Sequence, residues 1–275
     1  MFWQPEWLDI LSDNWRSHFI ESDGKLRAVW PYVPIRKGGF HIASWPPCTP
    51  YLGPLFLTKR VLPLDIPPKL SYVNCTFSNP AFAWVFGRKA RAMATQKLSL
   101  PAKPFSADLR RRLKNAAGEY IVSELDTTVV SDKIKYVREN WSAPIPPDAE
   151  RIFQEATRAG TGSVLALFSD EGDQSQPLAY LGVVWDKNTT YLLFITRSPS
   201  APSATAQVLL SAAIDAATGR NCIEFDFCAG FLKGVRDFFS QFGARPEWYG
   251  QLRIAKGPIM RSLEFMRSRW STSRI

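Results

Sequence analysis

The segment NCIEFDFCAG, residues 221–230, carries carboxylates at alternating positions. If it forms a strand, its aromatic residues take one face and its polar residues take the other, namely Cys222, Glu224, Asp226 and Cys228. Two carboxylates that share one side of a cleft repel each other and lose solvation, which raises the pKa of one of them toward that of a useful base. The spacing therefore predicts a general base at Asp226, with Glu224 beside it. In the alternative interpretation, Asp226 binds backbone N–H groups of the next turn and Glu224 is a solvated strand residue.

Three further residues near this segment have side chains suited to acyl transfer. Tyr249 can protonate a leaving thiolate or align a substrate, although a strand tyrosine that packs its ring in the core is the alternative. Lys233 and Arg236 follow Gly230 in the first turns of a predicted helix, where they can hold a phosphate or carboxylate. A solvent-facing helix surface would explain both cations equally well.

Cysteine and histidine chemistry is not indicated. The four cysteines form no CxxC pair, and His18 and His41 lie far along the chain from Cys222 and Cys228. This pattern predicts no zinc site and no redox motif, and neither histidine belongs to a GxSxG or Cys-His signature. We expect buried, reduced thiols and no metal.

Length and composition are those of a globular protein with one or two domains. The chain has 275 residues, of which 45% are hydrophobic and 21% charged. No apolar run approaches the roughly 18 to 20 residues that span a bilayer, and the first 15 residues hold three acids where a signal peptide would be basic and then apolar. We expect no transmembrane segment and a soluble, unprocessed, cytoplasmic protein.

Positive charge is concentrated in two segments. The net charge of the chain is +9, residues 85–114 hold nine Lys or Arg against Asp108, and residues 251–275 hold six against Glu264. Such patches favour an anionic partner, for example a phosphate-bearing cofactor, tRNA or a lipid surface. An ordinary solvated basic face is the alternative.

The proline-rich segment SAPIPPDAE, residues 142–150, is the best candidate for a boundary between two domains, 1–143 and 144–275. After it, the pattern predicts a helix capped by Asp148, three antiparallel strands, a helix over residues 203–220, a strand over 221–227, another helix and a last strand. The first half has a similar order of elements, with a long helix that begins after Ser106 and buries Tyr120. The order predicts a fold-level duplication.

One segment carries the signature of a known superfamily. FDFCAGFLKGVRDFFSQFGARPEWYGQLRI, residues 225–254, resembles acyltransferases of the GNAT superfamily, in the branch similar to Fem-type peptidoglycan aminoacyltransferases. The matching positions are Phe225, Asp226, Phe227, Gly230, Phe239, Phe242, Gly243 and Tyr249. In the first half, PPCTPYLGPLF, AFAWVF and RRRLKNA are similar to the proline-aromatic loop, tryptophan segment and basic helix of that branch.

This resemblance implies an α/β (α+β) protein made of two tandem GNAT-like domains, each a mixed, mostly antiparallel sheet flanked by helices. Asp226 then lies where the fifth strand ends and the sheet separates to admit the acyl group. The implied activity is that of an N-acetyltransferase-like enzyme, which moves an acyl group from acetyl-CoA or another acyl-CoA to an amine or hydroxyl. The C-terminal domain would hold the donor through Arg197, Ser198, Lys233, Arg236 and Gly230.

The predicted donor loop departs from the superfamily pattern. The usual loop contains glycines whose N–H groups hold the pyrophosphate at a helix N-terminus, whereas RSPSAPSATAQ, residues 197–207, has no glycine and two prolines. In the first half, Thr95 and Gln96 stand near the position of a tyrosine usual in the family. An aminoacyl-tRNA-dependent, Fem-like transferase and a non-catalytic ligand-binding or scaffold protein with the same fold are therefore alternatives.

The acceptor is predicted to lie in a groove of the N-terminal domain. The residues assigned to it are Pro47, Tyr51, Gly53, Trp84 and Arg111, and loop packing is the alternative explanation for the first four. The resemblance implies a small molecule or a cell-envelope precursor as acceptor, with tRNA as a possible partner. The sequence leaves the oligomeric state open.

Overall fold

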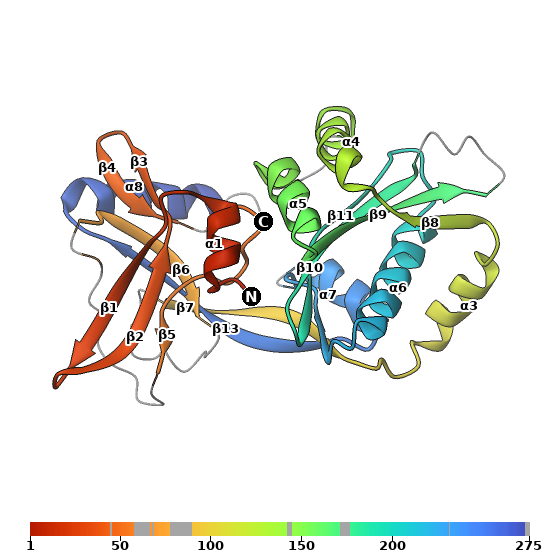
Figure 1. Ribbon diagram of the computed structural model, residues 1–275, viewed down its shortest axis with the longest axis horizontal. Coiled ribbons are helices and arrows are strands. Elements are labelled where there is room, and N and C mark those ends of the chain that lie inside the picture. The colour runs from red at the N-terminus through yellow and green to blue at the C-terminus, as the bar shows by residue number, and fades with distance from the viewer. Residues whose placement is uncertain are drawn as a thin grey trace. The chain divides into compact units, whose positions relative to one another are not determined.

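The computed structural model describes residues 1–44, 46–57, 67, 69–77, 90–141, 145–170, 177–230 and 232–272 (Figure 1). These residues group into two compact units. One unit contains Met1 and residues 94–247, and the other contains residues 2–93 and 248–275. These limits differ from the predicted boundary at 143/144. Each limit falls within a strand, so β7 (Ala90–Ser99) and β13 (Arg245–Ala255) each have residues in both units.

The unit of residues 94–247 is built on a sheet with the strand order β7-β12-β11-β10-β9-β8. Besides β7, the strands of this sheet are β8 (Tyr120–Glu124), β9 (Gly162–Ser169), β10 (Ala179–Trp185), β11 (Thr189–Arg197) and β12 (Glu224–Asp226). All neighbours are antiparallel except β11 and β12, which are parallel. The helices are α3 (Ala107–Asn115), α4 (Thr127–Asn140), α5 (Ala149–Arg158), α6 (Ala204–Gly219) and α7 (Lys233–Ser240).

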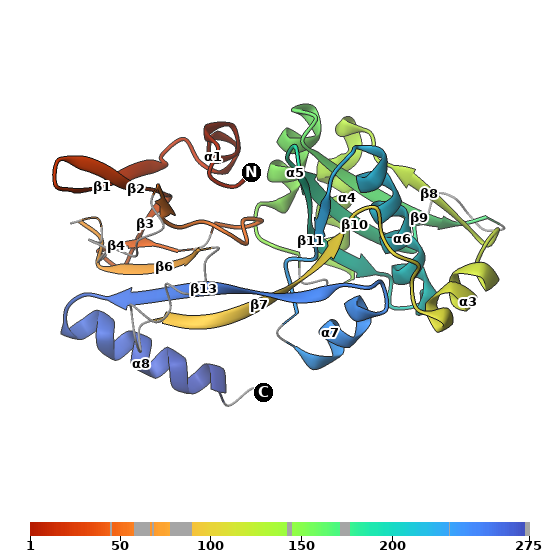
Figure 2. The same cartoon turned by 90° about the horizontal axis from the view of Figure 1, so that it is seen from below.

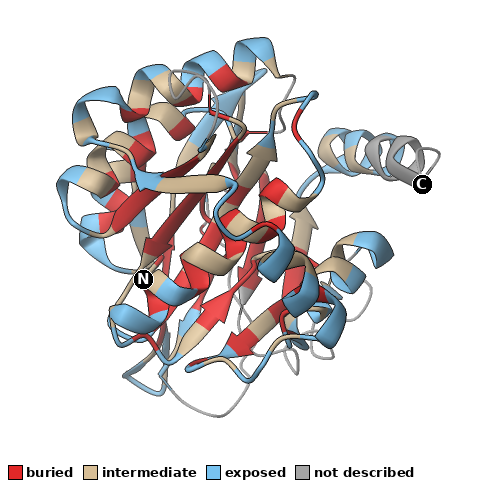
Figure 3. Cartoon of the chain, turned by 90° about the vertical axis from the view of Figure 1, so that its right-hand side faces the viewer, coloured by how far each residue is buried: buried red, intermediate tan, exposed pale blue. Residues whose placement is uncertain are grey.

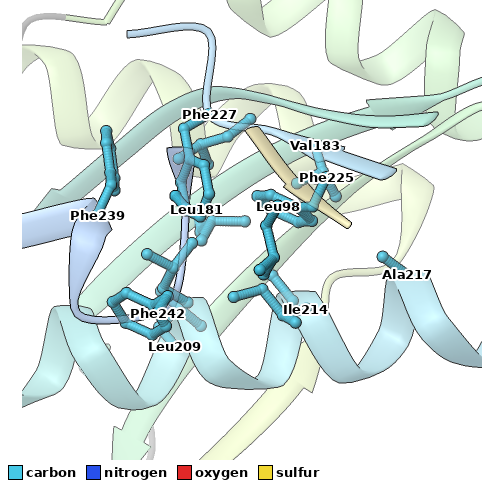
Figure 4. Close-up of a cluster of buried hydrophobic side chains, with 14 of the residues drawn as sticks. Leu98, Leu181, Val183, Leu209, Ile214, Ala217, Phe225, Phe227, Phe239 and Phe242 are labelled. Carbon is cyan, nitrogen blue, oxygen red and sulfur yellow. The ribbon is translucent and has the colours of Figure 1, made fainter. Parts of the chain in front are cut away.

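Alternation along the strands gives this sheet two apolar faces. On one face, side chains of β7, β10 and β12 meet those of α6 and α7, as Figure 4 shows for Leu98, Leu181, Val183, Leu209, Ile214, Phe225, Phe227, Phe239 and Phe242. On the other face, Phe153 of α5 packs edge-on against Phe194 of β11, with ring centroids 5.1 Å apart. Burial on both faces explains why these strands are almost continuously hydrophobic. Figure 3 shows the buried residues concentrated on the strands.

The other unit combines two sheets with the first and last helices. A sheet of order β1-β2-β5 contains β1 (Arg16–Ser22), β2 (Lys25–Tyr32) and β5 (Leu55–Phe56). A second set of strands has the order β3-β4-β6-β13, with β3 (Pro34–Lys37), β4 (Phe40–Ala43) and β6 (Tyr72–Phe77). Helix α1 covers Pro5–Leu11, and α8 (Pro258–Thr272) runs beside β13 (Figure 2).

The predicted fold class is confirmed: the protein is α+β, with mixed, mostly antiparallel sheets and flanking helices. Three local predictions are wrong. Helix α3 ends at Asn115, so Tyr120 belongs to β8 rather than to the buried side of that helix. Asp148 adopts a left-handed conformation with φ 59° and makes no side-chain cap. The strand predicted over 221–227 is limited to Glu224–Asp226, which leaves Ile223 63% exposed.

Candidate active site

The candidate site lies where β11 and β12 stop pairing. Parallel pairing joins Thr189 to Glu224 and ends at the pair Tyr191 and Asp226, whereas β11 continues to Arg197. Within the described part of the chain, no strand pairs with the later residues of β11 on the β12 side. An opening of this kind leaves backbone N–H and C=O groups of β11 available to a bound ligand.

Asp226 lies at this opening and is fully buried. One of its carboxylate oxygens, Oδ1, accepts a hydrogen bond from the hydroxyl of Thr95 at 2.6 Å and another from the backbone N–H of Cys228 at 2.8 Å. Cys228 adopts a positive φ of 52°, a conformation that costs energy for a residue with a side chain. The bond to its N–H therefore stabilises a strained turn, which is the anchoring role considered above as the alternative to a base.

Lys97 lies between the carboxylates of this face. In the antiparallel pairing of β7 with β12, Lys97 is directly opposite Asp226, and its ammonium contacts Glu224 at 3.0 Å and Glu247 at 2.9 Å. Burial opposes the charge of Lys97, but the bonds to Glu247 and Glu224 and the charge of Asp226 outweigh this effect and raise its pKa. The expected repulsion between two carboxylates is thus offset by a cation from another strand.

The charge of Asp226 also acts on its neighbours at the opening. Burial, and then the negative charge of Asp226, raise the pKa of the Cys228 thiol well above its usual value, although Lys97 opposes the change. Burial also raises the pKa of Tyr191, with Asp186 adding to the effect. At neutral pH both groups are protonated, so Cys228 is a poor nucleophile and Tyr191 is a hydrogen-bond donor.

Replacement of Asp226 by asparagine is expected to make Cys228 more reactive. The amide keeps an acceptor for Thr95 and the turn but removes the negative charge that raises the thiol pKa, so the onset of alkylation should move to lower pH. We expect the rate constant for iodoacetamide at pH 8 to rise, because a lower pKa increases the thiolate fraction of Cys228. Peptide mass spectrometry would measure it, with buried Cys222 as the internal control. An unchanged rate would show that the charge of Asp226 does not raise the pKa of the Cys228 thiol.

Beside Lys97 the same unit has a pocket of about 650 Å³. Its charged lining residues are Lys97, Lys103, Glu224, Arg245 and Glu247. The uncharged residues that complete the wall are Leu98, Ser99, Pro101, Pro104, Gly243, Ala244 and Pro246. The mixture of carboxylates and cations suits a polar ligand that has both an amine and an acidic group.

Several donors of the predicted donor loop, residues 197–207, are already hydrogen-bonded within the protein. The Arg197 guanidinium donates to the carbonyl of Ala201 at 2.6 Å, and the N–H groups of Ser198, Ala201 and Thr205 donate to carbonyls within the protein. Pro199 and Pro202 have no N–H group. This loop offers few backbone donors to a pyrophosphate at the start of α6.

Gly230 packs against a side chain that was not assigned to the site. Gly230 has a φ of 145°, and a Cβ there would lie 2.7 Å from Cγ of Gln96, so only glycine fits. Gln96 is 1% exposed, and neither atom of its amide has a hydrogen-bond partner among the described residues. The position of Gln96 near a family tyrosine was the only sequence signal for it. Thr95, Lys97 and Glu247 were not predicted either, since they join the site through pairing of distant strands.

The remaining donor residues, Lys233 and Arg236, are exposed on α7. Arg111 is exposed on α3 and forms an ion pair with Asp108 at 2.9 Å. Trp84 lies outside the described residues. Asp226 and Glu224 belong to one compact unit and Tyr249 to the other, so the catalytic role predicted for these three residues stays a prediction.

The residues predicted for an acceptor groove are packed within their own unit. The ring of Tyr51 is buried and contacts Tyr249 edge-on, with centroids 5.3 Å apart. Gly53 lies so close to the carbonyl of Thr76 that a Cβ would clash, and its own carbonyl accepts a bond from Trp3 at 2.8 Å. Pro47 is half-buried. These contacts match the packing alternative, and the groove stays a prediction.

Comparison with known proteins identifies the class of this fold. Residues 103–239 match the family model for the acetyltransferase (GNAT) domain, which covers the strand opening, the donor loop and α6. The chain therefore contains a domain of the GNAT superfamily of acyltransferases. A search of curated proteins by sequence finds no match.

Solved structures extend the similarity beyond the matched domain. FemX is 10% identical with a TM-score of 0.59, over 90% of both chains. L-PGS from Bacillus licheniformis is 14% identical with a TM-score of 0.57, over 96% of this chain and 90% of that one. A tandem GNAT protein from the clavulanic acid biosynthesis pathway is 12% identical with a TM-score of 0.52, over 92% and 94%. At these identities the comparisons show a shared fold, including the predicted tandem GNAT-like architecture.

Proposed function

We propose that this protein transfers an acyl group from an activated donor to an amine or hydroxyl acceptor, and that the donor enters between β11 and β12. The observation that carries the proposal is the end of pairing at Tyr191 and Asp226 in a GNAT domain. In such an opening, N–H groups of β11 can bind the donor and stabilise the oxyanion that forms when the acceptor attacks the acyl carbon. Tyr191 belongs to the last pair of residues before the opening, but its phenol donates to a carboxylate oxygen of Asp186 at 3.1 Å, so binding of the donor falls to the backbone of β11.

Two donor classes fit this proposal, an acyl-CoA and an aminoacyl-tRNA. The superfamily match supports the acyl-CoA. The loop of residues 197–207 supports the aminoacyl-tRNA as donor. The Arg197 guanidinium already donates to the carbonyl of Ala201, so it is not available to bind a pyrophosphate. Arg110 and Lys114 are exposed on α3 and add positive charge that suits a nucleic-acid backbone.

We expect acetyl-CoA to bind with a Kd weaker than 1 µM. Each missing N–H contact to a charged phosphate removes about 1.5 to 3 kcal/mol, or at least tenfold in affinity. Calorimetric titration would measure the Kd, and the double variant Pro199→Gly, Pro202→Gly, which restores two N–H groups, is expected to bind at least tenfold more tightly. A sub-micromolar Kd for the unmodified protein would show that the loop binds CoA despite its prolines.

Transfer itself can be tested with labelled donors. The protein would be incubated with labelled acetyl-CoA or with tRNA carrying labelled amino acids, together with a small-molecule extract and a cell-envelope precursor fraction. Movement of label from acetyl-CoA supports the first donor, and movement from charged tRNA supports the second. If neither donor binds and no label moves, the acyltransferase proposal is wrong and the non-catalytic alternative holds.

A further inference from the structure

Helix α8 has an unusual orientation, because its apolar side chains face solvent. Ile259, Leu263 and Met266 are spaced as on one side of a helix and are 61%, 46% and 51% exposed. Over residues 258–266, the part of the helix whose side chains are described, the half-buried positions are Met260 and Glu264. An amphipathic helix that packs on a sheet normally buries its apolar side.

The carboxylate of Glu264 explains which side of α8 faces the sheet. Glu264 pairs with Arg253 of β13 at 3.6 Å, and both side chains are about one-quarter exposed. This contact ties the side of α8 that carries Met260 and Glu264 to β13, beside which the helix runs in Figure 2. It also neutralises Glu264, the only acid in residues 251–275.

The surroundings of the exposed apolar residues are positively charged. Lys256 and Arg261 are exposed, and residues 251–275 carry a net charge of +5. A helix with an apolar side and flanking cations is suited to the interface of a membrane with anionic lipids, where the apolar side chains enter the acyl boundary and the cations meet headgroup phosphates.

We propose that α8 docks this protein on an anionic lipid surface through Ile259, Leu263 and Met266, with Lys256 at the headgroups. Among the described residues, no helix is long and apolar enough to cross a membrane. The contact is therefore one in which the helix lies on the bilayer. An anionic bilayer fits this face better than a protein because the segment combines exposed aliphatic side chains with a charge of one sign.

The test is sedimentation with vesicles of phosphatidylcholine, with or without about 30% phosphatidylglycerol, in about 0.1 M salt. Binding is expected only with phosphatidylglycerol. Leu263→Ser should weaken it by about tenfold, because an aliphatic side chain no longer leaves water. Lys256→Gln should weaken it by about fivefold, the effect of one cation near an anionic surface. Arg261→Gln should weaken it less, because Arg261 lies on the opposite side of the helix from Ile259 and Leu263.

The control is Leu26→Ser, which removes another exposed aliphatic side chain, on β2 far along the chain from α8. It should leave vesicle binding unchanged, and all four variants should keep the melting temperature because the residues are exposed. Equal binding of Leu263→Ser and the unmodified protein would overturn the proposal. It would also be overturned by a dimer that Leu263→Ser dissociates in sedimentation velocity, since α8 would then be a protein interface.

Discussion

Replacement of Phe227 by alanine is expected to lower the free energy of unfolding by about 3–5 kcal/mol, the largest effect of any single substitution considered for this protein. Phe227 is 1% exposed and follows β12 at the strand opening. Its ring lies 4.3 Å from that of Phe239 and 5.0 Å from that of Phe225, measured between centroids. Alanine would leave a cavity between the sheet and α7 that the surrounding aromatic rings cannot fill.

Urea unfolding monitored by circular dichroism would measure this loss. Ile223→Ala provides a matched control, because Ile223 lies four residues earlier in the same segment but is mostly exposed. It should change the free energy of unfolding by less than about 0.5 kcal/mol. Similar effects of the two variants would show that Phe227 is not part of a close-packed core.

Replacement of Gly182 by valine is expected to lower the free energy of unfolding by about 3 kcal/mol, at the upper end of the range for overpacked cores. Gly182 lies on β10 at a point where the register with β11 shifts. A Cβ at this position would lie 2.2 Å from Phe194 and 2.5 Å from Phe153, atoms of the aromatic pair on the α5 face. Neither ring can move freely, because each packs edge-on against the other.

This substitution has a second expected consequence. Phe194 belongs to the part of β11 that extends beyond its pairing with β12, so displacement of its ring should also disturb the proposed donor opening. Calorimetry would then show weaker donor binding at temperatures where the variant remains folded. Gly219→Val serves as the control for adding a side chain, because nothing beyond the backbone of its own helix lies within 4 Å of the Cβ position of Gly219. If Gly182→Val unfolds with unchanged midpoint, the aromatic pair must be looser than its geometry indicates.

Elements with a strong local pattern could be predicted from the sequence. The helix over 203–220 has apolar residues at three-to-four spacing and is found as α6, and the three predicted antiparallel strands are found as β9, β10 and β11. Tyr120 is the first of the residues YIVSE that form β8, but it was assigned to a helix because the basic segment before them has a helical pattern. Their β-branched residues pair with β9 instead, so tertiary pairing decided this segment.

The candidate site could be predicted only in part, for a related reason. Asp226 and Gly230 stand out in the sequence, because a carboxylate and a glycine follow a short hydrophobic strand. Thr95 and Lys97 complete the same site from a strand more than a hundred residues earlier, and no local pattern links that strand to β12. The register between distant strands placed Lys97 between the carboxylates. It also placed the uncharged hydroxyl of Thr95 against Asp226.

The division of the chain into compact units has a consequence for synthesis on the ribosome. Residues 2–93 emerge first, but β13, which neighbours β6 in their unit, is made only after residues 94–247 have been translated. At about 5–20 residues per second, the edge of β6 stays uncovered for roughly 10 to 30 s. An uncovered strand edge is a template for wrong pairing, so this nascent chain should depend on chaperones that bind early and release late.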